Sequence, residues 1–145
     1  SLHFAREGAH VVIGARRVER LEAVAADCEK AGAASAHFKE LDVGCTDSVN
    51  AVVDWLKGLT PKLDVLVNNA ALTYYCPVKD FPLNRWMRSW AVNFHAPFLL
   101  SKLVLEDMIP RGSGSIVNIS SGSAVGPGKY RPQRLVLLRR TLVIH

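Results

Sequence analysis

The chain has 145 residues, of which 49% are hydrophobic and 21% are charged, with 10 glycines and 7 prolines. This composition excludes intrinsic disorder and collagen-like or low-complexity sequence, and a chain of this size buries roughly 68–70% of its unfolded surface. The formal net charge of +5 is concentrated at the end, since residues 129–145 hold five of the 18 basic residues and none of the 13 acidic ones. A surface that binds nucleic acid spreads its basic residues over a face of the fold, so we expect no nucleic-acid partner.

The cysteines Cys28, Cys45 and Cys76 stand apart from one another, with no C-x-x-C pair and no histidine at ligand spacing. This usage suits a reducing compartment, so we expect a cytoplasmic protein without a metal site. No apolar run approaches the roughly 20 residues that span a bilayer, and the N-terminus has no signal-peptide pattern. We therefore expect no membrane span.

Strands and helices are predicted in alternation along the chain. Residues 1–8 have the pattern of the last two turns of a helix that ends at Gly8, so we expect the chain to begin inside an element. Apolar stripes at helical spacing predict helices over 16–31 and from residue 46 onward, the second opened by the capping residues Thr46, Asp47 and Ser48. Apolar runs predict four strands, at His10–Ala15, Ser35–Val43, Leu63–Val67 and Gly114–Ile119. This order is typical of an α/β fold with a mostly parallel sheet.

A long helical region from about Pro82 to Met108 is apolar on nearly every side and contains the aromatic residues Trp86, Trp90, Phe94 and Phe98. A helix of this kind is buried by the core and by a further surface, often a second subunit, so it favours a homo-oligomer that associates through Trp86 to Phe98. Pro97 is expected to kink this region or to restart it as a first-turn residue.

In an open α/β sheet, ligands bind outside the carboxyl ends of the strands. The residues at the predicted ends are polar, small or cationic, whereas the strand interiors are apolar. They are Arg16, Arg17, Asp42, Val43 and the runs 68–71 and 120–123. We therefore expect the ligand site among these residues.

Three motifs follow one another on the predicted elements. Residues 63–70 read Leu-Asp-Val-Leu-Val-Asn-Asn-Ala, Val92-Asn93 lies in the long helical region, and residues 114–121 read Gly-Ser-Ile-Val-Asn-Ile-Ser-Ser. In this order and spacing they resemble the short-chain dehydrogenase/reductase family of nicotinamide-dependent oxidoreductases. The resemblance covers residues 1 to about 128 and implies a Rossmann-like, doubly wound parallel sheet that is incomplete, without its central first strand and its C-terminal strands. Residues 129–145 match no part of the family and form a divergent basic tail.

The resemblance implies that the cofactor is NADP(H) rather than NAD(H). Arg16, helped by Arg17, stands where NADP-preferring members hold a basic residue, and Ala15 replaces the acid that binds the ribose hydroxyls of NAD. The alternative for Arg16 is an arginine in solvent at a helix start. By the same resemblance, Asp42 and Val43 meet the adenine ring, although Asp42 as a loop-capping residue is an even alternative.

The remaining cofactor contacts implied by the resemblance lie after the third and fourth predicted strands. Asn69, Ala70 and Ala71 line the cofactor ribose, with Ala71 in place of the usual glycine, and Ile119 lies beside the cofactor.

The resemblance makes Ser121 the catalytic serine, which hydrogen-bonds the substrate oxygen, with Ser120 or Ser123 in that role if the register differs. It also implies that Asn93 anchors a proton-relay water, and a buried asparagine that braces the helix is an equal alternative. The residues that follow the third predicted strand either line a substrate pocket or cover the core as loop residues. They are Tyr74, Tyr75 and Cys76.

Two parts of the family pattern are absent from the sequence. No Gly-rich turn precedes the strand at His10–Ala15, and no Tyr-x-x-x-Lys pair follows Ser121, because Tyr130 is followed four residues on by Arg134 with Pro132 between them. We do not assign Tyr130 as catalytic. In the strand order 3-2-1-4-5-6, loss of the first strand leaves the strands at Val11 and Val65 about 9.6 Å apart, too far for ladder hydrogen bonds.

The resemblance therefore implies an oxidoreductase that transfers hydride to or from a small carbonyl or alcohol substrate, with the 145 residues by themselves inactive. The alternative is a non-catalytic scaffold that acts through protein association along the helix from Trp86 to Phe98. A weaker third hypothesis gives the basic tail a role in binding phosphate or anionic lipid.

Overall fold

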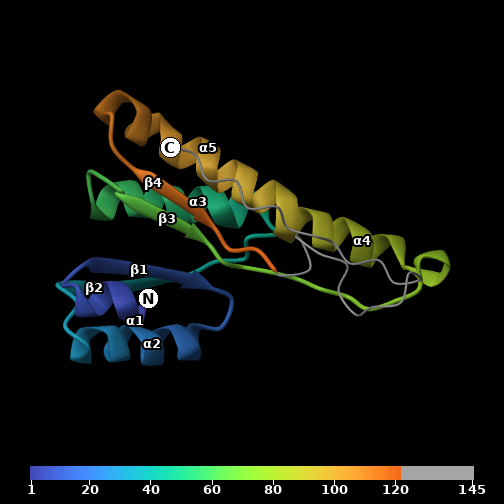
Figure 1. Cartoon of the computed structure of the whole chain (residues 1–145), viewed down its shortest axis with the longest axis horizontal. Helices are drawn as coiled ribbons and strands as arrows, with labels where there is room; N and C mark the ends of the chain where they lie inside the picture. The colour runs from blue at the N-terminus through green and yellow to red at the C-terminus, as the bar shows by residue number, and fades with distance from the viewer. Residues whose placement is uncertain (122–145) are drawn as a thin grey trace. The chain divides into compact units, whose positions relative to one another are not determined.

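The structure is a computed structural model that describes residues 1–121 (Figure 1). The chain forms two compact units, which we describe one at a time. The first consists of Ser1–Asp42 and Asp47–Val52, and the second of Val43–Thr46 and the chain from Val53 onward. Among the described residues, no helix is long and apolar enough to cross a membrane.

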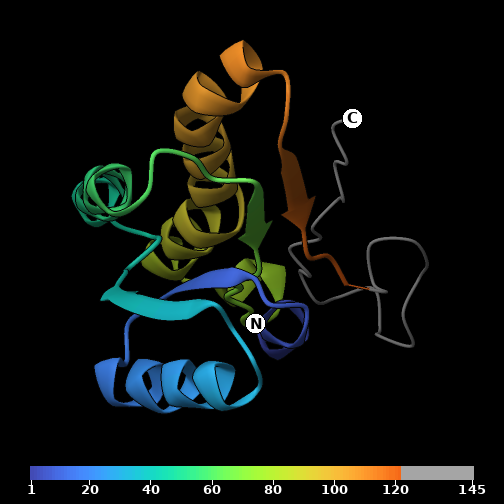
Figure 2. The ribbon, with the colours of Figure 1, turned by 90° about the vertical axis from the view of Figure 1, so that its left-hand side faces the viewer.

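The first unit is built on one parallel strand pair. Its elements are α1 (Leu2–Arg6), β1 (His10–Ala15), α2 (Val18–Lys30) and β2 (Ser35–Glu40). The β1 and β2 strands pair from His10 with Ser35 to Ala15 with Glu40, and α2 lies along one face of the pair (Figure 2). Ala5, Val11 and Cys28 form the buried core of this unit. Gly8, with φ of 72°, supplies the left-handed turn that ends α1.

The second unit repeats the arrangement of strand, helix and parallel strand. Its strands β3 (Val65–Asn68) and β4 (Ser115–Asn118) pair in parallel, and α5 (Ala96–Arg111) lies along one face of the pair. Between them run the 3₁₀ turn η1 (Val78–Asp80), α4 (Leu83–Trp90) and the π-helical turn η2 (Ala91–His95). Val104, Met108 and Ile116 form the buried core between α5 and the strands. The helix α3 (Thr46–Leu59) is shared between the units, with Asp47–Val52 in the first and its remaining residues in the second.

The strands β1–β2 and β3–β4 form two separate sheets, and no strand within residues 1–121 pairs with both. This agrees with the expectation that the strands at Val11 and Val65 share no ladder. The described residues therefore form an incomplete α/β fold of the Rossmann type. The predicted boundary at Gly128 lies outside the described residues.

Two local predictions about the region after β2 are wrong. The strand predicted over Ser35–Val43 ends at Glu40, because the chain turns there toward α3. The predicted caps of α3 do not cap it: Cys45 occupies the N-cap position, and Ser48 Oγ instead accepts a hydrogen bond from the Asp42 N–H at 3.0 Å. Ser48 therefore closes the turn after β2 rather than the start of the helix.

The prediction that Pro97 restarts the long helix is confirmed. Pro97 is the second residue of α5 and follows the π-helical turn η2. Proline has no N–H to donate to the carbonyl of Asn93, four residues earlier, and its ring crowds that carbonyl. A widened turn at this point is one of the standard ways in which a helix accommodates such a break.

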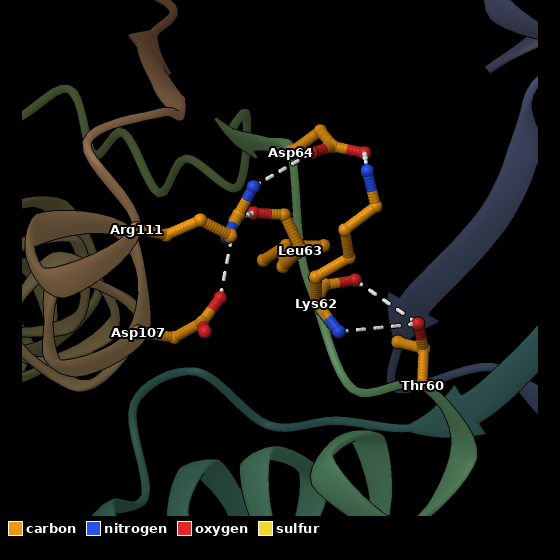
Figure 3. Close-up of polar contacts among 6 residues, drawn as sticks. All are labelled: Thr60, Lys62, Leu63, Asp64, Asp107 and Arg111. Carbon is orange, nitrogen blue, oxygen red and sulfur yellow. Dashed lines mark hydrogen bonds and ion pairs between the residues drawn. The ribbon is translucent and has the colours of Figure 1, made fainter.

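Arg111, at the end of α5, ties that helix to the chain that enters β3 (Figure 3). Its guanidinium donates to Asp64 Oδ1 at 2.9 Å, to the Leu63 carbonyl at 2.7 Å and to Asp107 Oδ2 at 3.1 Å. Lys62 Nζ lies 3.4 Å from the other Asp64 oxygen. Burial raises the pKa of Asp64, but hydrogen bonds from Arg111 and Lys62 and their positive charges outweigh it, so the pKa lies below the ordinary value.

The lowered pKa of Asp64 predicts an acid-sensitive contribution to stability. A carboxylate of this kind stabilises the fold at pH values above its ordinary pKa of about 3.9, and the contribution is lost as the pH falls through the lowered value. We expect Asp64→Asn to lower the urea midpoint at pH 7 and to make less difference at pH 3. The exposed Asp54→Asn in α3 is the matched control and should change little at either pH. An Asp64→Asn effect of equal size at both pH values would contradict the prediction.

Candidate active site

The carboxyl ends of β3 and β4 are locked together by two hydrogen bonds. Asn68 and Asn118 are partners in the strand register, and Asn68 Nδ2 donates to Asn118 Oδ1 at 2.9 Å. The Ile119 N–H donates to the Asn68 carbonyl at 3.0 Å. These bonds continue the pairing one residue beyond the strands, so the segments that follow β3 and β4 begin next to each other.

Asn93 holds the loop that leaves β3. Its Nδ2 donates to the Leu72 carbonyl at 2.7 Å, and its Oδ1 accepts from the Leu72 N–H at 2.9 Å. Asn93 is buried in the π-helical turn η2. Both hydrogen-bonding groups of the side-chain amide are therefore committed to one backbone residue, so the side chain braces the loop after β3 rather than its own helix. An anchoring role toward a relay water stays a prediction.

The residues expected to contact cofactor and substrate in the second unit lie at this shared edge. Asn69, Ala70 and Ala71 are exposed directly after β3, and Ser121 is exposed shortly after β4. Ile119 is 43% exposed. Within the described residues, no residue other than glycine has a positive φ, so Ala71 occupies the usual glycine position without backbone strain. Ser123 lies outside the described residues.

The predicted residues of the first unit lie at the carboxyl edge of its own strand pair. Arg16 directly follows β1, and Arg17 is the N-cap residue of α2; both are exposed. The Leu41 N–H donates to the Ala15 carbonyl at 2.9 Å, which places the chain after β2 beside the chain after β1. Asp42 follows at this edge and is half-buried, and its backbone N–H is taken by Ser48.

The loop after β3 is held against α4 by aromatic contacts. The Tyr74 ring meets Phe81 edge to face at 6.3 Å, and the Arg85 guanidinium lies 5.3 Å from the Tyr74 ring centre. Tyr74 therefore packs against Phe81 and α4, whereas Tyr75 is 60% exposed. Cys76 Sγ donates to the Asp80 carbonyl at 3.5 Å and closes the same loop.

Two features of the site were not predicted. The first is the Asn68–Asn118 pair, whose signal was two asparagines in the same position of two strands with similar sequence. The second is Arg88 of α4, whose Nη1 donates to the Gly44 carbonyl at 3.3 Å. Nothing in the local sequence marks Arg88, because its partner lies 44 residues away.

The described residues fit a nicotinamide dinucleotide. In the second unit, the small exposed residues 69–71 allow a ligand to approach the backbone, and Ser121 carries a hydroxyl shortly after β4. In the first unit, Arg16 offers an exposed guanidinium suited to a phosphate. No group of three or more metal-binding side chains occurs in the described part of the chain.

Comparisons of this chain with a family model and with curated proteins indicate the same family. The family model for short chain dehydrogenase matches residues 1–132. A short chain dehydrogenase/reductase of Gibberella zeae is 38% identical over 127 residues, which cover 86% of this chain and 46% of that protein.

Solved structures agree. A metagenomic short-chain oxidoreductase in complex with NADP matches with a TM-score of 0.82 at 33% identity, over 87% of this chain and 57% of that one. An NAD⁺-bound xylitol dehydrogenase matches with a TM-score of 0.80 at 30% identity, over 91% and 50%. The chain thus spans about half the length of these relatives. With paired asparagines closing β3 and β4, an asparagine in the helix between them and serines after β4, all inside the matched residues, this chain belongs to the short-chain dehydrogenase/reductase family.

Proposed function

We propose that this protein is an NADP(H)-dependent oxidoreductase that transfers hydride between the cofactor and a small carbonyl or alcohol substrate. The observation that supports the proposal is the locked carboxyl edge of β3 and β4, since residues 69–71 and Ser121 follow these two strands. The reaction requires a loop of small residues that the cofactor can approach and a hydroxyl that can bind the substrate oxygen. The residues of this edge include both.

The residues near this edge have separate roles toward cofactor and substrate in the proposed reaction. The cofactor, when bound, gives or accepts hydride at nicotinamide C4. Ser121 donates a hydrogen bond to the substrate oxygen, and the backbone of residues 69–71 approaches the ribose. Ile119 packs beside the cofactor, and Asn93 keeps the loop after β3 in place while anchoring a relay water.

Arg16 carries the proposed preference for NADP(H). The two related structures were solved with NADP and with NAD⁺, so the fold by itself does not select the cofactor. Arg16 is exposed at the end of β1, and residues 15–17 contain no acid to repel a 2′-phosphate. We propose that Arg17 assists, and that Asp42 and Val43 lie against the adenine ring.

The substrate class and the location are proposed at a coarser level. A small alcohol or carbonyl compound fits the family, in which xylitol dehydrogenase is a structural neighbour. Cys28, Cys45 and Cys76 are free thiols. A reducing compartment keeps thiols in this state, which supports a cytoplasmic location.

We further propose that the 145 residues by themselves bind NADPH weakly and show little reductase activity. The sequence contains no Gly-rich turn before β1 to bring backbone amides to the pyrophosphate. It also contains no Tyr-x-x-x-Lys pair after Ser121, so the proton donor of the family mechanism is not assigned.

A second candidate function, self-association, rests on a row of apolar side chains on α4, η2 and α5. We name this row the aromatic stripe, and it consists of Leu83, Trp86, Met87, Trp90, Phe94 and Phe98. Trp90 stacks on Trp86 at 6.2 Å and on Phe94 at 4.6 Å between ring centres. Four side chains of the stripe are between 48% and 73% exposed, namely Leu83, Met87, Trp90 and Phe98. A single chain therefore leaves these side chains exposed, and burial by a second subunit stays a prediction. A second copy bound along the stripe would bury it, whether the protein is an enzyme or a non-catalytic scaffold.

The cofactor preference is tested by replacing Arg16. Because a charge-assisted hydrogen bond to phosphate contributes about 1.5 kcal/mol or more, we expect Arg16→Ala to weaken NADPH binding about tenfold or more and to leave NADH binding unchanged. Binding is measured by fluorescence titration, with the exposed Arg6→Ala in α1 as control. For the parent chain, we expect a dissociation constant for NADPH above the micromolar range. Micromolar binding would contradict the proposed weakness, and equal loss for both cofactors would contradict the role of Arg16.

The aromatic stripe is tested by its oligomeric state. We expect the parent chain to be a dimer by sedimentation equilibrium and Met87→Glu to be a monomer with an unchanged circular dichroism spectrum, because the change buries a charge only in the dimer. The exposed Asn84→Glu lies off the stripe and should stay dimeric. A monomeric parent chain would exclude this surface as an interface. A dimer that never binds NADPH, even in the millimolar range, would favour the scaffold over the enzyme.

A further inference from the structure

The loop between β2 and α3 is anchored to α4. Residues Val43–Thr46 belong to the second unit, although the strand before them belongs to the first. Arg88 of α4 donates from Nη1 to the Gly44 carbonyl at 3.3 Å, and both groups are partly buried. A surface arginine thus reaches across to a backbone group of a loop that is distant in sequence.

Arg88 lies so close to Gly44 that position 44 has no room for a side chain. A Cβ atom on Gly44 would lie 2.6 Å from Arg88 Nη1, 2.9 Å from its Cζ and 3.1 Å from Cγ2 of Val92. The φ of Gly44 is not in the left-handed region, so the backbone itself does not require glycine. Glycine is required here because of space. The Arg88 guanidinium and the buried Val92 lie so close to the Gly44 backbone that a side chain at this position would clash with them.

The same helical segment holds a second loop. Five residues after Arg88, Asn93 makes two hydrogen bonds to the backbone of Leu72, in the loop that leaves β3. Arg88 and Asn93 therefore fix the loops that follow two different strands from one stretch of α4 and η2. Because a helical segment is stiff, their separation sets the spacing between Gly44 and Leu72.

We propose that Arg88 is a positioning residue that fixes the Val43–Thr46 loop and, through it, the orientation of Val43 toward the adenine ring. The second half of this inference rests on the proposed function. Lysine would supply the charge and a donor, but not the flat group that fits against Gly44. We therefore expect Arg88→Lys to restore only part of the effect.

The loop half is tested by backbone order parameters from ¹⁵N relaxation of the full chain. We expect values of about 0.85 at Gly44 and Cys45 in the parent chain and below about 0.6 in Arg88→Met. The matched control is Arg85→Met in the same helix, which removes the contact with Tyr74 and should leave Gly44 unchanged. Gly44→Ala displaces the Arg88 guanidinium by placing a methyl group against it. The double variant of Arg88→Met and Gly44→Ala should therefore lose no more backbone order at residue 44 than either single variant. Unchanged order at Gly44 in Arg88→Met would overturn the inference.

The cofactor half is tested by following the Val43 amide chemical shift while NADPH is added up to millimolar concentration. We expect Arg88→Met to weaken NADPH binding about tenfold, Arg88→Lys to weaken it less, and Arg85→Met to match the parent. Equal NADPH affinity in parent and Arg88→Met would overturn the positioning role even if the loop loosens. A parent chain that does not respond to NADPH, with a loop that loosens as expected, would overturn the proposed function and the cofactor half, and the loop half would stand.

Discussion

The second unit depends on the register of one parallel strand pair. Because β3 and β4 start and stop at matching residues, Asn68 and Asn118 meet side chain to side chain, and the Ile119 N–H continues the ladder to the Asn68 carbonyl. A slip of one residue would turn Asn68 to the other face and send Ile116 out of the core. The hydrophobic pattern of two short strands therefore decides where the segment that carries Ser121 starts relative to the loop after β3.

The helical segment that runs from α4 to α5 holds two loops that follow strands. Pro97 breaks the regular helix at the turn that contains Asn93, and the π-helical turn lets a buried amide face the loop after β3 rather than lie along a regular helix. Arg88 lies just before the break and holds the loop after β2. One helical segment thus holds two loops, one from regular helix and one from the widened turn that accommodates the proline.

Much of this fold follows from local sequence, and the site follows from it only in part. The bounds of β1 were predicted correctly from its apolar run between glycine and arginine, and residues 69–71 and 120–121 follow strands as the alternation of elements predicted. The end of β2 and the caps of α3 were missed, because Ser48 bonds Asp42 instead of its own helix end. Arg88 was missed for the same physical reason: its partner, Gly44, is brought near only by tertiary packing, which no local pattern records.

The central claim is that the edge formed by β3 and β4 is preformed by the chain itself, without any ligand. Amide hydrogen exchange of the cofactor-free chain tests it most directly, at the Leu72 and Ile119 amides, whose hydrogen bonds go to Asn93 and Asn68. We predict that both exchange as slowly as the amides inside the β3–β4 ladder, since local openings there require the unit to unfold. Exchange as fast as in an unstructured chain would show that the edge is not formed in advance and would contradict the account.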